Sequence, residues 1–157
     1  MRHGGLSNHP PELVERALTV GPVAALQHQL SLLARDGERD VLPFAELHGL
    51  GVLTWAPLAS GFLTDGFDVD ALHPDDFRRR HPFARLDLES LRAELQRLAT
   101  THDATSSQVA IAWVLSRPAV AGAIVGVRNA REAEDLPASA ALRLEESELR
   151  ALAAAAP

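Results

Sequence analysis

The side chains best suited to recognise a ligand stand at the ends of short apolar runs. Ser7 and Asn8 follow the glycines near the N-terminus, Gln27 ends the run VAAL, Trp55 ends GVLTW, and Arg128 comes just after AIVG. An aromatic face can hold a flat ring, an amide can hydrogen-bond a polar substituent, and an arginine fork matches a phosphate. These residue types favour ligand binding over acid–base catalysis.

Each of these residues also has a structural interpretation. Trp55 could be a core aromatic at the end of a strand, and Arg128 could be a solvated surface charge. Ser7 and Asn8 could form a turn and helix cap before the two prolines that follow them. Gln27 ends an apolar run, where a buried amide needs a hydrogen-bond partner, and a ligand amide is one such partner. On the residues alone, both interpretations stay open.

Residue types that usually carry catalysis or metal binding are scarce. The chain has no cysteine and no tyrosine, and its positive charges are all arginine. The absence of cysteine removes disulfides, thiolate metal sites and cysteine nucleophiles together. The seven histidines are dispersed, without a pair at metal-ligand spacing. We therefore assign no metal ion.

Composition bounds the class of protein. A length of 157 residues with 46% hydrophobic residues is enough for one domain with its own core. The net charge of -6 and a single short basic cluster, Arg78–Arg80, argue against a nucleic-acid partner and an anionic membrane surface. The sequence shows neither a signal-peptide h-region nor a membrane-length apolar segment, so we expect a cytoplasmic protein.

Short apolar runs alternate with helical patterns along the chain. We expect strands at residues 2–6, 23–26, 51–55 and 120–125, and unbroken apolar runs of this kind are typical of strands buried on both faces of a parallel sheet. Helices are expected at 11–20, 40–48, 87–101, from the Thr105–Gln108 capping box to Pro118, and at 129–136 and 145–156. Repeated strand–helix units predict an α/β fold of about four parallel strands with right-handed crossovers and two open edges.

Six segments then resemble, in order and at matching spacing, motifs of the aldo-keto reductase family. They are GLSN (5–8), QHQLSLL (27–33), LPFAELHGLGV (42–52), WAPLASGFLT (55–64), QVAIAWVL (108–115) and IVGVR (124–128). The resemblance runs nearly end to end, but only against the C-terminal half of the family. It implies that residues 1–157 are the C-terminal half of a (β/α)8 TIM barrel, an NADP-dependent oxidoreductase domain with a variable loop at roughly 66–86. The basic cluster Arg78–Arg80 lies in that loop, and we expect it to be mobile and solvated.

The resemblance also implies an NADP(H) site. Ser7, Asn8 and Gln27 correspond to the family's residues for the nicotinamide carboxamide, and Trp55 to the aromatic that stacks on the nicotinamide ring. The loop that follows would wrap the pyrophosphate, and the end of the eighth strand with the next helix would meet the adenosine 2'-phosphate and the adenine. These two segments contribute Ala56, Pro57, Leu58, Gly61, Gly126, Val127, Arg128, Glu132 and Asp135.

Departures from the family pattern weaken this site. Ala56 replaces a serine, Leu30 a tyrosine and Leu136 an asparagine, and Asp65 brings a negative charge near the expected phosphate. The family's catalytic Asp, Tyr, Lys and His lie on its first four strands, so the resemblance implies no catalytic residue here.

We therefore expect a truncated or split chain that is inactive by itself, and whose complete form would reduce aldehydes or ketones. The alternatives are a non-catalytic half-barrel that self-associates or pairs with a complementary N-terminal half, and a gene remnant that folds poorly.

Overall fold

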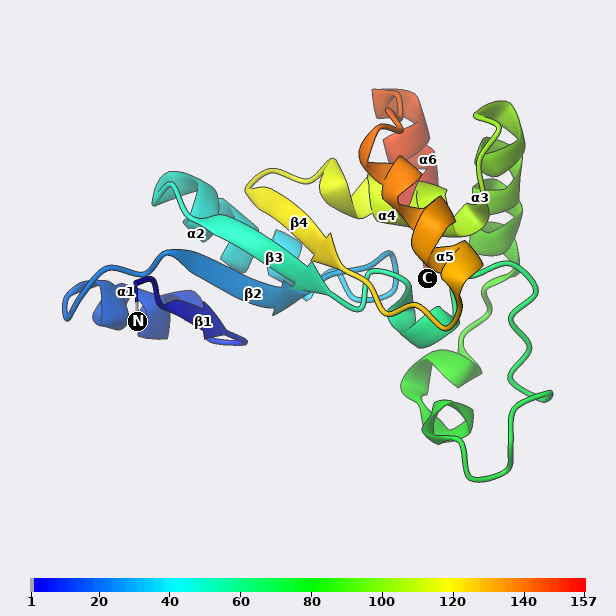
Figure 1. Ribbon diagram of the computed structural model, residues 1–157, viewed down its shortest axis with the longest axis horizontal. Coiled ribbons are helices and arrows are strands. Elements are labelled where there is room, and N and C mark those ends of the chain that lie inside the picture. Colours follow the sequence, from blue (N-terminus) through cyan, green and yellow to red (C-terminus); the bar gives the residue numbers. More distant parts are fainter. Residues whose placement is uncertain (1) are drawn as a thin grey trace.

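Four parallel strands form one sheet, in the order in which they occur along the chain (Figure 1). The computed structural model describes residues 2–157. The strands are β1 (Gly5–Ser7), β2 (Ala25–Gln29), β3 (Gly51–Trp55) and β4 (Val120–Ile124). The register sets Leu6 beside Leu26 and Leu26 beside Val52. The predicted parallel α/β architecture of about four strands is confirmed.

The second strand lies further along the chain than its apolar run indicated. The predicted strand covered residues 23–26, whereas β2 covers Ala25–Gln29 and includes three polar residues. Gln27 and Gln29 pair beside Leu53 and Trp55, on one face of the sheet, while His28 lies on the opposite face against Gly37. Successive residues of β2 face opposite sides of the sheet, which are different environments. The second half of the strand is polar, so it did not extend the apolar run from which the strand was predicted.

Helices connect the strands close to the predicted positions. The α-helices are α1 (Pro11–Leu18), α2 (Val41–Leu47), α3 (Glu89–Thr101), α4 (Ser106–Leu115), α5 (Ala130–Asp135) and α6 (Glu146–Ala155). Short 3₁₀ helices cover Asp36–Glu38, Ala59–Gly61, Phe77–Arg80, Pro82–Arg85 and Leu136–Ala140. No helix among residues 2–157 is long and apolar enough to cross a bilayer.

Among the described residues, the core packs against one side of the sheet. Leu26 and Val52 point to this side and are buried together with residues of the connecting helices, such as Ala45 of α2. The helix α4 is buried almost all round, and its Trp113 is fully enclosed. In Figure 1, α3, α4 and α6 gather beyond one end of the sheet, where His102 Nε2 meets Glu148 Oε1 at 2.9 Å between α3 and α6.

The opposite face of the sheet is open. Leu53 and Ile124, on this face, are 38% and 45% exposed. Within the part of the chain that the structure describes, no helix lies in front of the strands in Figure 1, whereas α2 lies behind them. The expectation of strands buried on both faces is therefore wrong for these residues, because the elements present cover only one face.

The loop between β3 and α3 contains packed rings and internal hydrogen bonds, although its basic cluster was predicted to be mobile and solvated. The rings of Phe62, Phe67, His81 and Phe83 pack together, with Phe62 and Phe67 centroids 4.6 Å apart. Arg79 Nη1 donates to the carbonyl oxygens of Val69, Asp70 and Leu72. The prediction of a solvated basic cluster is wrong for Arg79, because the loop wraps its own carbonyl groups around this guanidinium.

An ion pair fixes the middle of this loop. Arg78 Nε donates to Asp76 Oδ1 at 2.9 Å, and Arg78 Nη2 donates to Asp76 Oδ2 at 2.7 Å. The same guanidinium lies over the Phe67 ring, 5.6 Å from its centroid. The hydrogen bonds from Arg78 lower the pKa of Asp76 to about 2. This pair is a two-point contact, the geometry in which arginine binds carboxylates best.

The helix α4 begins with the capping box that the sequence predicts. Gln108 N donates to Thr105 Oγ1 at 3.2 Å, and Thr105 N donates to Gln108 Oε1 at 2.8 Å. Gln108 Nε2 also donates to the backbone oxygen of Asp135 at 2.7 Å, which ties this helix start to α5. The prediction is confirmed.

Replacing Thr105 by alanine should lower the free energy of unfolding by about 1 kcal/mol, because the amide of Gln108 loses its acceptor. Urea unfolding followed by circular dichroism measures the change. Thr100→Ala is the matched control, since Thr100 is exposed within α3 and alanine is a better helix former there. Equal destabilisation by both changes would contradict a capping role.

The Asp76 carboxyl should titrate with a midpoint of about 2 rather than the ordinary 3.8. Because its pKa is lower in the folded state, the pair contributes stability above pH 3.8, and this contribution is lost as the pH falls toward 2. Carbon NMR of the side-chain carboxyl gives the midpoint directly. In Arg78→Gln the midpoint should move back toward 3.8, and an unchanged midpoint would show that Arg78 is not the cause.

Candidate functional site

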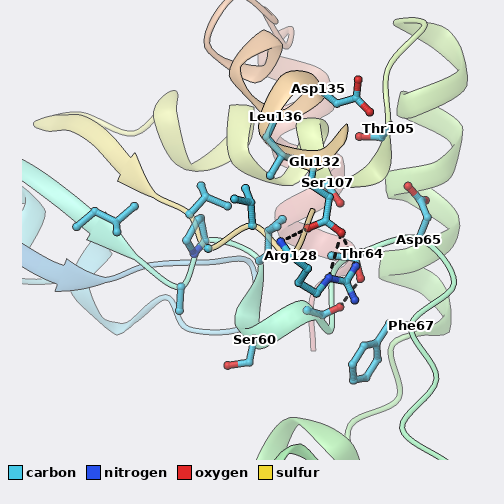
Figure 2. A pocket seen from close by; sticks show the side chains of 18 of the residues that line it. Ser60, Thr64, Asp65, Phe67, Thr105, Ser107, Arg128, Glu132, Asp135 and Leu136 are labelled. Atoms are coloured by element: carbon cyan, nitrogen blue, oxygen red, sulfur yellow. Dashed lines mark hydrogen bonds and ion pairs between the residues drawn. The ribbon is translucent and has the colours of Figure 1, made fainter. Parts of the chain in front are cut away.

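A cavity of about 500 Å³ opens at the carboxyl ends of β3 and β4. Its walls come from the loop after β3, the loop after β4, the beginning of α4 and one side of α5 (Figure 2). Parallel α/β proteins build their binding sites at this end of the strands, and the volume suits a small organic ligand. The cavity is therefore the first candidate for a binding site.

The loop after β3 forms the first wall in a strained conformation. Ala56, Ala59 and Ser60 have φ angles of 53°, 49° and 58°, and Gly61 follows with 98°. Left-handed backbone at a residue with a Cβ costs of order 1 kcal/mol, and such residues cluster at ligand-binding loops. The turn leaves Ala56, Pro57, Leu58 and Gly61 lining the cavity.

The opposite wall carries an arginine held by a glutamate. Arg128 Nε and Nη2 donate to Glu132 Oε1 at 3.0 and 2.7 Å, and Arg128 N donates to Glu132 Oε2 at 2.8 Å (Figure 2). Asn129 caps α5 by accepting from Glu132 N. The hydrogen bonds from Arg128 lower the pKa of Glu132, so the carboxylate stays ionised. Gly126, Val127 and Asp135 complete this wall.

A third side of the cavity is the beginning of α4. Thr105 and Ser107 line it, and Ser106 N donates to Asp65 Oδ2 at 3.2 Å. A carboxylate at a helix N-terminus is favoured by the exposed amides and the helix dipole. Asp65 therefore has a partner of its own inside the protein, and its charge is directed at the helix start.

More acidic than basic side chains line the cavity. The basic ones are Arg78 and Arg128, and the acidic ones are Asp65, Glu132 and Asp135. Each arginine already forms a two-point pair with a carboxylate, Arg78 with Asp76 and Arg128 with Glu132. Asp135 faces Arg131, with 3.4 Å between Arg131 Nε and Asp135 Oδ2.

The other predicted site residues form a hydrogen-bonded row at the ends of β1, β2 and β3. Trp55 Nε1 donates to Asn8 Oδ1 at 3.0 Å, and Asn8 N donates to the backbone oxygen of Gln27 at 2.9 Å. Ser7 Oγ donates to Gln27 Oε1 at 3.4 Å. Asn8 has a left-handed φ of 57°, which turns the chain out of β1. Trp55 directly precedes Ala56, so the row meets the cavity at the end of β3.

The structure thus divides the predicted binding residues into two adjacent groups. Ala56, Pro57, Leu58, Gly61, Gly126, Val127, Arg128, Glu132 and Asp135 line the cavity, while Ser7, Asn8, Gln27 and Trp55 form the row beside it. Their roles toward a cofactor stay predictions. Among residues 2–157, no group of three or more histidine or acidic side chains is arranged to hold a metal ion.

Further lining residues went unnoticed in the sequence. They are Ser60, Thr64, Phe67, Arg78, Thr105, Ser107, Ile124 and Val125. Thr105 was visible only as a helix cap, and Arg78 only as part of a basic cluster. Phe67, Arg78, Thr105 and Ser107 reach the cavity from outside the two predicted segments, whereas Ser60, Thr64, Ile124 and Val125 lie within the motifs that supplied the predicted residues. Leu136 also lines the cavity, where the family pattern has an asparagine.

Comparison with known proteins connects this geometry to a family. The family model described as "Aldo/keto reductase family" matches residues 1–157. "Probable aldo-keto reductase 1" of Glycine max is 29% identical over 161 residues, covering 100% of this chain and 46% of that protein. "Aldo-keto reductase str7" of Strobilurus tenacellus is 29% identical, covering 97% of this chain and 48% of that protein. The chain spans about half the length of these relatives.

Solved structures give the same proportion. A glycerol dehydrogenase from Gluconobacter oxydans superposes with a TM-score of 0.89 at 30% identity, over 98% of this chain and 48% of that one. A thermostable aldo-keto reductase solved with the inhibitor epalrestat has a TM-score of 0.74 at 25% identity and the same coverage. The four parallel strands and their helices therefore have the fold of half a barrel. The chain belongs to the aldo/keto reductase family.

Proposed function

We propose that this chain is the nicotinamide-dinucleotide-binding half of an aldo-keto reductase barrel, the C-terminal half that the sequence motifs indicate. The observation that carries the proposal is the cavity at the ends of β3 and β4, with the Trp55 row beside it. In its complete form the protein would reduce a small aldehyde or ketone. The bound dinucleotide would supply the hydride, and a cytoplasmic location remains a prediction.

The two groups of residues suit the two ends of such a ligand. The cavity offers strained backbone and small residues for a pyrophosphate, and α5 side chains for an adenosine. The row offers the face of Trp55 for a flat ring. Asn8 Oδ1 accepts from Trp55 and Gln27 Oε1 accepts from Ser7, so the NH2 groups of both amides are the parts that can donate to a carboxamide.

Proton transfer would need residues beyond these 157. Reduction of a carbonyl requires an acid near the oxygen that becomes the alcohol. The chain contains neither tyrosine nor lysine, the pair that the family uses for this step. The residues present can therefore bind and orient, and we assign none of them a catalytic role.

The open face of the sheet fits the same proposal. Leu53 and Ile124 leave apolar surface exposed where a parallel sheet is normally covered. A complementary half-barrel, carrying the remaining strands, would cover this face and supply the missing acid. This arrangement accounts for both deficits with a single partner.

Dinucleotide binding should quench the fluorescence of Trp55, since the ring is half-exposed at the end of β3 while Trp113 is fully buried. Trp55→Leu should abolish the quenching and weaken binding about tenfold, equivalent to about 1.4 kcal/mol of stacking. Fluorescence titration and calorimetry with NADH and NADPH measure both effects.

Trp113→Phe is the control variant, because it removes the buried fluorophore and leaves the site intact. Quenching should persist in this variant. Unchanged affinity in Trp55→Leu would show that the ring does not contact the ligand.

The isolated chain should consume neither NADH nor NADPH with a broad panel of aldehydes and ketones, because we assign none of the described residues the role of acid toward the carbonyl oxygen. Absorbance of the reduced nicotinamide follows the reaction. Turnover that survives further purification would contradict the assignment of the catalytic acid to another part of the enzyme.

A further inference from the structure

The side chain best placed to bind an extra phosphate at the adenosine end is already occupied. Arg128 directs both Nε and Nη2 at Glu132 Oε1, and its backbone amide at Glu132 Oε2. Asn129 Nδ2 lies 3.3 Å from Oε1 and adds a fourth contact to the Glu132 carboxylate. The fork that would match a phosphate is therefore turned toward a carboxylate four residues along the same chain.

The second arginine of the cavity is held in the same manner. Arg78 Nε and Nη2 donate hydrogen bonds to the two carboxylate oxygens of Asp76. Among the lining residues that the structure describes, Arg78 and Arg128 are the only basic ones. A phosphate entering here would meet guanidinium groups whose Nε and Nη2 already face carboxylates, so it could use only the remaining N–H groups and would lie beside those carboxylates.

The acidic side chains that line the cavity also disfavour a bound phosphate. Asp65, Glu132 and Asp135 all line the cavity, so its carboxylates outnumber its guanidinium groups. A 2'-phosphate carries between about one and a half and two negative charges at neutral pH. Bringing it beside Glu132 would place like charges together in a partly enclosed space, which raises the cost of binding.

We propose that this cavity selects a dinucleotide with a free ribose 2'-hydroxyl, NAD(H), over its 2'-phosphorylated form, NADP(H), and that Glu132 determines the choice. The inference rests on the proposed function, because it assumes that the adenosine end lies between the loop after β4 and α5. It departs from the NADP(H) preference that the family resemblance implied.

A carboxylate suits the hydroxyl for a direct reason. An ionised carboxylate only accepts hydrogen bonds, and a ribose 2'-hydroxyl has a proton to donate. Glu132 Oε2 accepts a single hydrogen bond in the structure, from Arg128 N, so a lone pair remains for this donor. Acidic residues serve dinucleotides with a free 2'-hydroxyl in other nucleotide-binding folds, and arginines serve the phosphorylated ones.

The test compares two probes that lack nicotinamide, ADP-ribose and 2'-phospho-ADP-ribose, by calorimetry on the whole chain. The wild type should bind ADP-ribose about tenfold more tightly. Glu132→Gln removes the negative charge and frees Arg128, so it should raise the affinity for 2'-phospho-ADP-ribose about tenfold and shift the preference toward it.

Glu134→Gln is the matched control. It makes the same change on the same helix, at an exposed residue that does not line the cavity. The preference should be unchanged in this variant. Thermal melting of all three proteins shows whether each is folded at the temperature of the titration.

Each outcome has a distinct meaning. Tighter binding of 2'-phospho-ADP-ribose by the wild type, or no shift in Glu132→Gln, overturns the inference while leaving dinucleotide binding intact. An equal shift in Glu134→Gln also overturns it, because the effect would then follow net charge rather than position. Binding of neither probe overturns the proposed function itself, and this inference with it.

Discussion

Parallel pairing of the strands is the constraint on which the site depends. Because all four strands run in the same direction, their carboxyl ends meet at one edge of the sheet. The loop after Trp55 and the loop after Ile124 are separated by more than sixty residues of sequence, yet the register places Trp55 beside Ile124. The cavity exists because these two loops leave the sheet together.

The sheet also leaves one of its two faces uncovered. Helices cover one face, and the other face, with Leu53 and Ile124, has no cover among the described residues. In a (β/α)8 barrel the helices lie outside the strands, so the uncovered face corresponds to the interior side of a barrel. Under the proposal, the same missing half would supply both the apolar cover and the catalytic acid, so stability and activity would depend on one interface.

The proposed preference for NAD(H) over NADP(H) depends on the pairing of charged side chains in the cavity. In an isolated sequence motif, Arg128 is a free cation that suits phosphate. In the folded chain, one helical turn brings Glu132 back onto it, and the two charges are satisfied by each other. Asp65 also has an internal partner, because its carboxylate accepts a hydrogen bond from Ser106 N at the start of α4.

The sequence by itself determined the parallel α/β class, the position of β3, the Thr105 cap and the family, because these follow from local patterns and motif order. It missed the extension of β2 over Gln27, since a strand with one open face carries no continuous apolar run. Only the tertiary structure divided the predicted binding residues into a cavity and a row, added Arg78 and Ser107 to the lining, and paired Arg128 with Glu132. These features depend on which distant segments come into contact and on how each side chain is oriented. A local sequence pattern specifies neither.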